Sequence, residues 1–217
     1  MEYNGVQIKW YGHDTFTLSH NNITVCTDPY RIEKKITADL VLVSHNHFDH
    51  LSVDDLAKIS HEKTVIVAAK ECIDQISTKC ERIIGLAPGE ETTIHNIRIR
   101  GVPAYNLNKI NPDTKKPFHP KEDNKLGFII TMNGSTFYHT GDTDLIPEMS
   151  GTSPDVAFVP VSGTYVMTAS EAAEAVQRIK PKVAIPMHYG TIVGSPSDAE
   201  ALKNTVTSCQ VQILSKE

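Results

Sequence analysis

Cysteine is scarce in this chain of 217 residues, and its four copies, Cys26, Cys72, Cys80 and Cys209, form no CxxC pair and follow no regular spacing. Such thin, scattered usage does not predict a framework of disulfide bonds in a chain of this length. It indicates reduced thiols, and we therefore expect a cytoplasmic protein.

Long apolar runs are also absent. No run approaches the ~18 residues that would span a bilayer. The first ten residues, MEYNGVQIKW, lack the charged-then-apolar pattern of a signal peptide. These two absences predict a soluble chain with no membrane partner.

Blocks of positive charge are missing too. Lysine and arginine occur in short pairs at most, the formal net charge is −5, and the pI is near 6.0. Proteins that bind nucleic acid mainly through its phosphates carry concentrated positive charge, so nucleic acid is not the expected partner. The charge balance does not exclude a small anionic substrate, because a metal ion supplies its own local positive charge.

The chain does have enough apolar residues for a sizeable core, since 40% of its residues are hydrophobic and 22% are charged. Single α/β domains commonly reach about 200–250 residues. We find no internal repeat, no low-complexity tract and no linker. The sequence therefore predicts one α/β domain over residues 1–217.

Expected strands and helices are mixed along the whole chain. Ser52 with Asp55, and Thr168 with Glu171, have the spacing of capping boxes and predict helix starts, and Pro181 ends the second of these helices. Alternating or continuous apolar residues predict the strands. The expected strands are 6–10, 16–18, 23–26, 40–43, 64–68, 82–85, 91–101, 126–132, 135–139, 156–161 and 183–186, with further helices near 72–79 and 199–203.

Residues 104–125 stand out because they are rich in asparagine, lysine and proline and show no periodicity. A segment of about twenty residues without regular structure is unusual inside a compact domain, and it is more often a functional lid than filler. We expect it to lie over a site.

The densest chemistry is in VSHNHFDHLS, residues 43–52, which holds His45, His47, Asp49 and His50 directly after an apolar strand. Imidazole and carboxylate are preferred ligands of zinc and similar divalent ions. Positions two apart in an extended segment share a face, so His45 and His47 can bind one ion. Asp49 and His50 follow where the chain turns into a helix, so they can face a second ion.

Two further stretches carry the same residue types at strand ends: His139-Thr140-Gly141-Asp142-Thr143-Asp144, and Pro186-Met187-His188-Tyr189-Gly190. Side chains at strand ends can converge on one rim of a sheet, where α/β proteins keep their sites. We therefore expect Asp142 and His188 to join the histidine-rich stretch.

These stretches together resemble the metallo-β-lactamase superfamily over about residues 8–194. The resemblance rests on the HxHxDH motif, the Gly141-Asp142-Thr143 segment, the Pro186-Met187-His188 segment, and Asp28 after an early strand. The nearer likeness is to a branch of small, uncharacterised metal-dependent hydrolases, through Gly12-His13-Asp14-Thr15-Phe16 and the segment from Tyr138 to Asp144. The resemblance implies an αββα four-layer sandwich with a metal site at one edge.

The resemblance also implies roles. Asp142 would bridge two divalent ions, and His188 would complete the second site. We expect Zn²⁺, with Mn²⁺ or Fe²⁺ as alternatives. Two ions roughly 3.5–4 Å apart lower the pKa of a shared water towards 7. We place Asp49 and His139 in catalysis: Asp49 would orient the nucleophile or carry its proton, and His139 would orient a ligand by hydrogen bonding.

One departure from the family pattern concerns the first metal. The superfamily usually supplies a further histidine before the Gly-Asp segment, and this chain has Asn106 near that place. A neutral amide oxygen is a poorer zinc ligand, so the first site would be weaker or filled only with substrate. His119 is the other nearby candidate as a metal or substrate ligand. His13 is a candidate of the same kind, and Asp28 would brace the histidine loop through backbone N–H groups.

The leading hypothesis is a binuclear metal-dependent hydrolase in which a metal-bound hydroxide attacks an ester, lactone, amide or phosphoester of a small molecule. Alternatives are a nuclease or phosphodiesterase acting on nucleic acid, a di-iron redox protein, and a non-catalytic metal-binding protein. Di-iron relatives carry glutamate at the position of His47, which argues against the redox alternative. The sequence leaves open the natural substrate and whether the chain forms a homo-oligomer.

Overall fold

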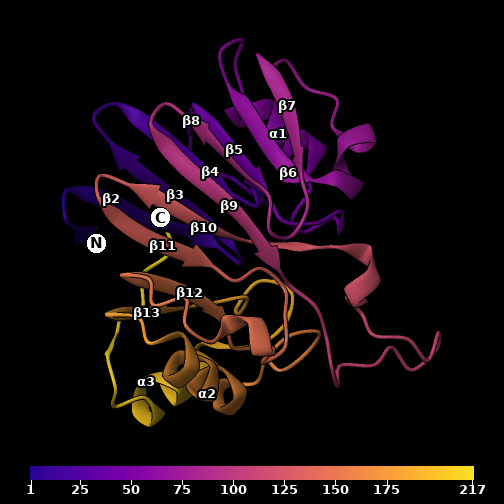
Figure 1. Cartoon of the computed structure of the whole chain (residues 1–217), viewed down its shortest axis with the longest axis vertical. Helices are drawn as coiled ribbons and strands as arrows, with labels where there is room; N and C mark the ends of the chain where they lie inside the picture. The colour runs from indigo at the N-terminus through magenta and orange to yellow at the C-terminus, as the bar shows by residue number, and fades with distance from the viewer.

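Two seven-stranded sheets lie face to face in the computed structural model, which describes residues 1–217 (Figure 1). The first sheet runs in chain order from β1 to β7, and the second has the order β14-β13-β12-β11-β10-β9-β8. The strands of the first sheet are β1 (Glu2–Tyr3), β2 (Val6–Gly12), β3 (Thr15–His20), β4 (Ile23–Thr27), β5 (Leu40–Val43), β6 (Val65–Ala69) and β7 (Arg82–Leu86). Those of the second are β8 (Glu91–Ile94), β9 (Ile97–Pro103), β10 (Leu126–Met132), β11 (Ser135–His139), β12 (Val156–Pro160), β13 (Val183–Met187) and β14 (Gln210–Val211).

Helices lie on the outer faces of the two sheets, so the predicted αββα four-layer sandwich is confirmed. Figure 1 shows α2 and α3 beside β12 and β13, at the opposite end of the molecule from α1, which lies beside β5 and β6. The helices are α1 (Val53–Ile59), α2 (Ala169–Ile179) and α3 (Pro196–Thr205), with short 3₁₀ turns at Lys70–Gln75, Lys121–Asp123 and Pro147–Met149.

The caps predicted from sequence form as expected. The Ser52 hydroxyl accepts a hydrogen bond from the amide of Asp55 at the start of α1. Thr168 and Glu171 form both bonds of a capping box at the start of α2. Helix α2 ends where Lys180 takes a left-handed conformation, and Pro181 follows. These caps satisfy backbone groups that a helix end leaves without partners.

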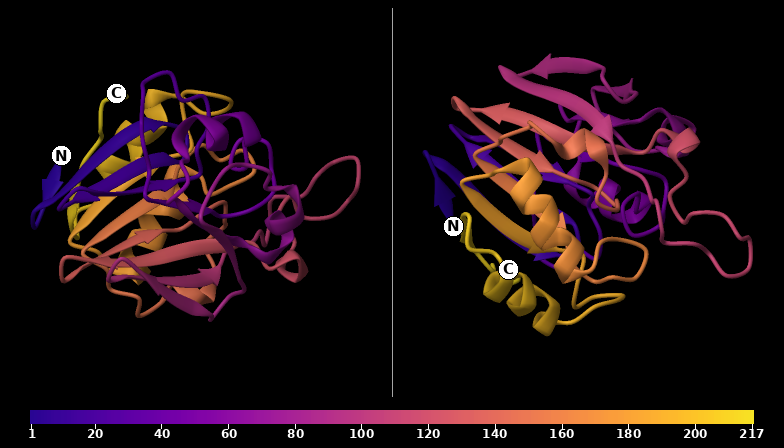
Figure 2. Two further views of the ribbon diagram at one scale, coloured as in Figure 1. Left: turned by 90° about the horizontal axis from the view of Figure 1, so that it is seen from above. Right: turned by 60° about the horizontal axis from the view of Figure 1, so that its bottom comes forward.

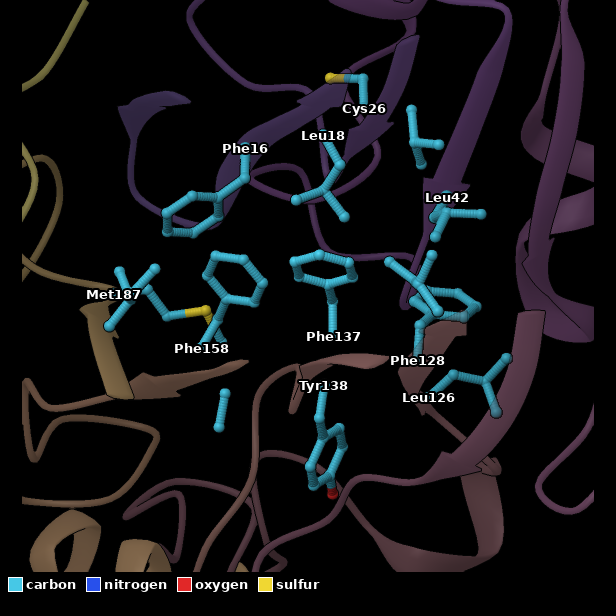
Figure 3. Close-up of a cluster of buried hydrophobic side chains, with 14 of the residues drawn as sticks. Phe16, Leu18, Cys26, Leu42, Leu126, Phe128, Phe137, Tyr138, Phe158 and Met187 are labelled. Atoms are coloured by element: carbon cyan, nitrogen blue, oxygen red, sulfur yellow. The ribbon is translucent and has the colours of Figure 1, made fainter. Parts of the chain in front are cut away.

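The main core fills the space between the sheets. Figure 3 shows Phe16 and Leu18 of the first sheet opposite Phe137 and Phe158 of the second, and the rings of Phe16 and Phe158 lie 4.4 Å apart. Tyr138 points to the other side of its sheet, as the two-residue period of a strand requires. Each fully buried side chain of this size contributes about 1.5–3 kcal/mol relative to exposure. The core therefore fixes how the two sheets face each other.

Strand direction explains where the polar residues gather. Strands β4 to β7 pair in parallel, and so do β11 to β14. The carboxyl ends of β5, β11 and β13 lead into His45, Asp142 and His188 respectively. Parallel strands end at the same edge of their sheet, so residues distant in the sequence meet there.

Three predicted elements need correction. The strand expected over 91–101 is a hairpin of β8 and β9, because His95 and Asn96 both take positive φ and turn the chain. The helix expected over 72–79 is a 3₁₀ turn over residues 70–75. The last helix is longer than residues 199–203, because Ser195 caps it and Pro196 begins it.

Residues 104–125 leave the sheet after β9, and the tip of this segment extends away from the body of the protein (Figures 1 and 2). An isolated bridge between Ile110 and Pro117 closes the tip. At its base, the amide of Asn106 donates to the carbonyl of His119 at 2.8 Å.

None of the helices combines the length and the apolarity needed to cross a membrane.

Candidate metal centre

The motif after β5 is a tight turn whose side chains face the edge where the two sheets meet. The amides of His50 and Leu51 both donate to the carbonyl of His47, at 3.0 and 2.8 Å. This turn places His45 and His47 on one side, with ring centroids 4.6 Å apart. His50 is wholly buried and lies against Asp142 of the second sheet, at 3.4 Å from Nε2 to Oδ1.

A first cluster consists of His45, His47 and His119, whose nearest nitrogens all lie within 4.8 Å of one another. The closest pair is His47 Nδ1 and His119 Nε2 at 3.3 Å. His119 comes from the far end of the 104–125 segment and is 1% exposed. The chain thus supplies a third imidazole to this cluster from a place different from the one the family pattern suggests.

Asn106 was expected to stand in the site, but the structure places it behind His119. Its Oδ1 accepts from the amide and from Nδ1 of His119, both at 2.9 Å. Its Nδ2 donates to the carbonyl of Tyr165 at 2.8 Å. All of its amide capacity is therefore used to hold the segment and to orient His119, and the prediction of Asn106 as a ligand is corrected.

A second cluster consists of His13, Asp49, His50 and His188, again with candidate ligand atoms within 4.8 Å of one another. His13 Nε2 lies 2.9 Å from Asp49 Oδ2. Burial, together with the charge of His188, lowers the pKa of His13 to about 4. A neutral His13 donates its Nε2–H to Asp49, so the geometry makes it an orienting partner of that carboxylate.

Asp142 lies between the two clusters. Its Oδ2 is 3.3 Å from His119 Nε2 and 3.2 Å from His188 Nε2, while its Oδ1 faces His50. Gly141 makes this position reachable, because it has φ +65° and a Cβ there would collide with the carbonyl oxygen of Leu126. Asp142 is the one carboxylate in contact with both clusters.

Most ring nitrogens on the far side of the clusters have partners, but the buried Nδ1 of His13 has none. His50 Nδ1 donates to Asp28 Oδ2 at 2.9 Å, and His188 Nδ1 contacts Ser162 Oγ at 3.0 Å. Asp28 also accepts from the amide and the hydroxyl of Ser44, each at 2.7 Å. Asp28 therefore braces the loop through Ser44, as expected, and it also fixes the ring of His50. Ser162 orients His188.

His139 was expected to act in catalysis, and the structure corrects this. It is wholly buried and lines no part of the pocket over the clusters. Its Nε2 lies 3.0 Å from the carbonyl of Asp14, and its Nδ1 accepts from the amide of Gly141 at 3.3 Å. Burial lowers its pKa. A neutral His139 with both nitrogens engaged ties β11 to the β2–β3 turn.

Sequence reasoning missed Asp14. This residue is wholly buried, neither of its carboxyl oxygens has a hydrogen-bond partner, and it belongs to a cluster with His50, Asp142 and His188. Burial raises its pKa well above the usual range for aspartate. In the sequence it stands within the Gly12-His13-Asp14-Thr15-Phe16 segment that carries the family resemblance, and no spacing rule singles it out.

The clusters contain both neutral histidines and a histidine whose positive charge is favoured by a nearby carboxylate. Burial lowers the pKa of His45 well below its usual value and that of His47 to about 4, so these imidazoles are neutral with free lone pairs. Burial opposes a charge on His188, but the Asp142 carboxylate outweighs it and raises the pKa of His188 to about 9. The buried carboxylate requires a positive charge beside it, which a proton or a metal cation provides.

The donor set fits divalent metal ions. Buried atoms without a hydrogen-bond partner include His45 Nε2, His50 Nε2, His188 Nε2 and Asp142 Oδ1. Leaving such atoms unpaired costs about 1–3 kcal/mol each, so folded proteins normally satisfy them. A histidine whose second ring nitrogen is held by a carboxylate, hydroxyl or amide oxygen is the usual arrangement of a metal ligand.

A pocket of about 470 Å³ opens over the clusters. Three of its lining residues belong to the two clusters, Asp142 lies between the clusters, and the others come from the loops around them. The lining residues are Asn46, His47, Phe48, Asp49, Phe118, His119, Asp142, Tyr165 and Ile192. Asp49 is the cluster carboxylate most open to this pocket, with 14% of its side chain exposed against 4% for Asp142.

Sequence comparisons agree with this geometry. A family model described as the beta-lactamase superfamily domain matches residues 7–188. A UPF0173 metal-dependent hydrolase of Thermoplasma acidophilum is 33% identical, covering 93% of this chain and 92% of the relative. One from Staphylococcus aureus is 30% identical, with 96% of each chain covered.

Solved structures have the same fold. A protein from Parabacteroides distasonis superposes with a TM-score of 0.82 at 30% identity, covering 96% of this chain and 92% of that one. The metallo hydrolase Igni18 of Ignicoccus hospitalis gives a TM-score of 0.77 at 24% identity, covering 97% and 95%. The second likeness concerns the fold alone.

Proposed function

The chain belongs to the β-lactamase superfamily and is a metal-dependent hydrolase. From that premise we propose that it is a binuclear enzyme with zinc as its metal. Its substrate would be a small molecule that contains an ester, lactone or phosphoester bond. The observation that carries the proposal is Asp142, a buried carboxylate in contact with histidines of two separate clusters. A shared carboxylate between two donor sets is the arrangement that a pair of ions needs.

The proposed ligands divide between two ions. His45, His47 and His119 would hold the first, while Asp49, His50 and His188 would hold the second, with Asp142 shared. Imidazole-rich sets with carboxylates suit zinc, and iron or manganese are the alternatives. When bound, such ions acidify a water molecule and polarise the bond under attack.

The chain's own residues would position the reaction. Burial raises the pKa of Asp49, but the hydrogen bond from His13 and the charge of His50 outweigh it and lower that pKa to about 2. Asp49 is thus an ionised hydrogen-bond acceptor on the pocket floor, able to orient a water molecule. His13 fixes the direction in which this carboxylate points.

We also propose a small-molecule substrate and a cytoplasmic location. None of the residues that line the pocket is lysine or arginine, which favours a small molecule over nucleic acid. All four cysteines are free thiols, and two of them are buried, as suits a reducing cytoplasm.

The test combines metal analysis with hydrolysis of ester, lactone and phosphodiester probes by the metal-loaded protein. We expect two metal equivalents per chain in the wild type, about one in His188→Ala, and a loss of hydrolysis of at least about 100-fold in that variant. His61→Ala, on a partly exposed histidine outside both clusters, serves as the matched control and should behave as the wild type. A fully loaded protein that hydrolyses no probe, with His188→Ala no different, would favour a metal-binding protein without catalysis.

A further inference from the structure

One wall of the pocket is formed by apolar side chains. Phe48 lies between His47 and Asp49 in the loop between β5 and α1, and Phe118 directly precedes His119 in the 104–125 segment. Tyr165 is in the loop between β12 and α2, and Ile192 is in the loop between β13 and α3. The rings of Phe118 and Tyr165 meet edge to face, with centroids 4.6 Å apart. Four separate loops therefore contribute one apolar side chain each to the same opening.

These side chains are unusually exposed for their type. Phe48 is 67% exposed, Ile192 38% and Tyr165 36%. Single exposed apolar residues are common on protein surfaces and need no explanation, but several around the mouth of one concave site mark a place where an apolar group binds. The floor of the same pocket holds the polar groups of the two clusters.

Positive side chains near the pocket are already paired. Lys125 is 3% exposed, lies 2.9 Å from Glu71 and donates to Asn46 Oδ1 at 3.3 Å. Lys109 contacts both carboxylate oxygens of Glu171, at 2.8 and 2.9 Å. A phosphate group outside the reacting bond would find no free cationic partner among the lining residues.

We propose that the substrate is an uncharged carboxylic ester or lactone whose alkyl or aryl group packs against Phe48, Tyr165 and Ile192. This inference rests on the proposed hydrolase function and narrows it, because it removes phosphorylated metabolites from the substrate class. The pocket volume of about 470 Å³ is within the range of sites that enclose small organic molecules.

The reaction balances without a further reactant. Water adds its oxygen to the carbonyl carbon, and the bond from that carbon to the alkoxy oxygen breaks. One proton of the water goes to the departing oxygen. The products are a carboxylic acid and an alcohol, joined in one molecule when the substrate is a lactone.

The test uses the metal-loaded protein and 4-nitrophenyl acetate, hexanoate and octanoate, with 4-nitrophenyl phosphate and bis(4-nitrophenyl) phosphate alongside. Burial of extra methylene groups in an apolar pocket should raise kcat/KM for octanoate at least about tenfold over acetate. Phe48→Ser should abolish most of this difference by lowering kcat/KM for octanoate. Ile110→Ser is the matched control, because Ile110 is 45% exposed at the tip of the 104–125 segment and lines no part of the pocket.

A second readout does not depend on catalysis. Octanamide is an uncharged, slowly hydrolysed analogue, and its binding to the protein is measured by saturation-transfer NMR. We expect a signal on the alkyl chain that Phe48→Ser weakens and Ile110→Ser does not. Binding of octanamide without hydrolysis of any ester or phosphoester would support the apolar site and contradict the proposed hydrolase function. Equal kcat/KM values for acetate and octanoate, or faster hydrolysis of the phosphoesters, would contradict the proposed substrate class. The proposed hydrolase function would remain.

Discussion

At the scale of single residues, the site depends on side chains that orient other side chains. Asp28 holds His50, Ser162 holds His188, and Asn106 holds His119, each through the ring nitrogen that faces away from Asp142. Such contacts fix which nitrogen carries a proton and where the ring points. These contacts among the chain's own residues therefore orient the nitrogens that face Asp142.

Asn106→Ala tests this directly. The substitution removes the acceptor of the His119 Nδ1–H bond, so His119 should lose its fixed orientation. We expect the affinity of the first metal to fall about 10–100-fold while the second is retained. Competition titration with a chromogenic chelator measures both affinities. The control is Asn204→Ala, on the exposed face of α3, and equal affinities in the two variants would contradict the role given to Asn106.

Gly141→Ala tests the backbone that presents Asp142. The new Cβ would meet the carbonyl oxygen of Leu126, in addition to the cost of a side chain at positive φ. Gly134→Ala is a matched control, because Gly134 has φ +71° and no atom within 4 Å of an added Cβ. Urea unfolding should show Gly141→Ala less stable than Gly134→Ala by at least about 2 kcal/mol. A smaller difference in unfolding free energy would mean that the turn rearranges to accept the Cβ at little cost.

At the scale of elements, the 104–125 segment is tied to helix α2. Glu171, the third residue of that helix, accepts from the amide of Thr168 at 2.7 Å. It also accepts from Lys109 and from Asn108 Nδ2. One carboxylate thus completes the helix cap and anchors the segment that carries His119.

The Glu171 anchor should depend on pH. Burial opposes its charge, but the bonds from Lys109, Thr168 and Asn108 outweigh burial and lower its pKa to about 2. A lowered pKa means that its contribution is complete above about pH 4.5 and is lost as the pH falls towards 2. We expect Glu171→Gln to cost about 1 kcal/mol of unfolding free energy at pH 7, after allowing for solvent screening. Urea unfolding at pH 7, 5, 4 and 3 should show this cost shrinking.

Glu174→Gln is the control for that series, because Glu174 is exposed on the same helix. A difference between the Glu171→Gln variant and the wild type that stays constant from pH 7 to pH 3 would show that the carboxylate charge does not anchor the segment.

Local patterns predicted the elements that carry their own signals. The capping residues Ser52 and Thr168 mark helix starts because their side chains act within three residues. The β8–β9 hairpin was missed because its turn, His95-Asn96, contains neither glycine nor proline. Regular structure was therefore predictable wherever the cause lay within a few residues.

The site was predictable only in part, for the same reason. His45, His47, Asp49 and His50 are adjacent in the sequence, so their density alone indicated a site. Asn106 looked like a ligand because of its order along the chain. What decides between Asn106 and His119 is how the 104–125 segment folds back on itself, a long-range contact that no local pattern encodes.

At the scale of the whole molecule, the two sheets are held together by their apolar core and, at one edge, by polar groups that oppose each other across the interface. His50 lies in the loop after β5 of the first sheet, and Asp142 and His188 lie in the loops after β11 and β13 of the second. Metal ions shared between these residues would link the two sheets. Metal binding should therefore stabilise the fold as a unit.

Chelation tests that link. A ligand at 100 times its dissociation constant stabilises the folded state by about 2.7 kcal/mol. Removal of metal with EDTA should lower Tm by several degrees in the wild type, with zinc restoring it. In His188→Ala the shift should be smaller, because one donor set is incomplete. Differential scanning calorimetry measures both shifts in Tm. Identical shifts in the two proteins would show that metal binding does not stabilise the contact between the two sheets.

The most direct test of the central claim is anomalous scattering from crystals of the protein grown with zinc, recorded on both sides of the zinc absorption edge. The account predicts two peaks about 3.5–4 Å apart, one on each side of the Asp142 carboxylate. The first should lie against His45, His47 and His119, and the second against Asp49, His50 and His188. A single peak, or peaks that avoid Asp142, would contradict it.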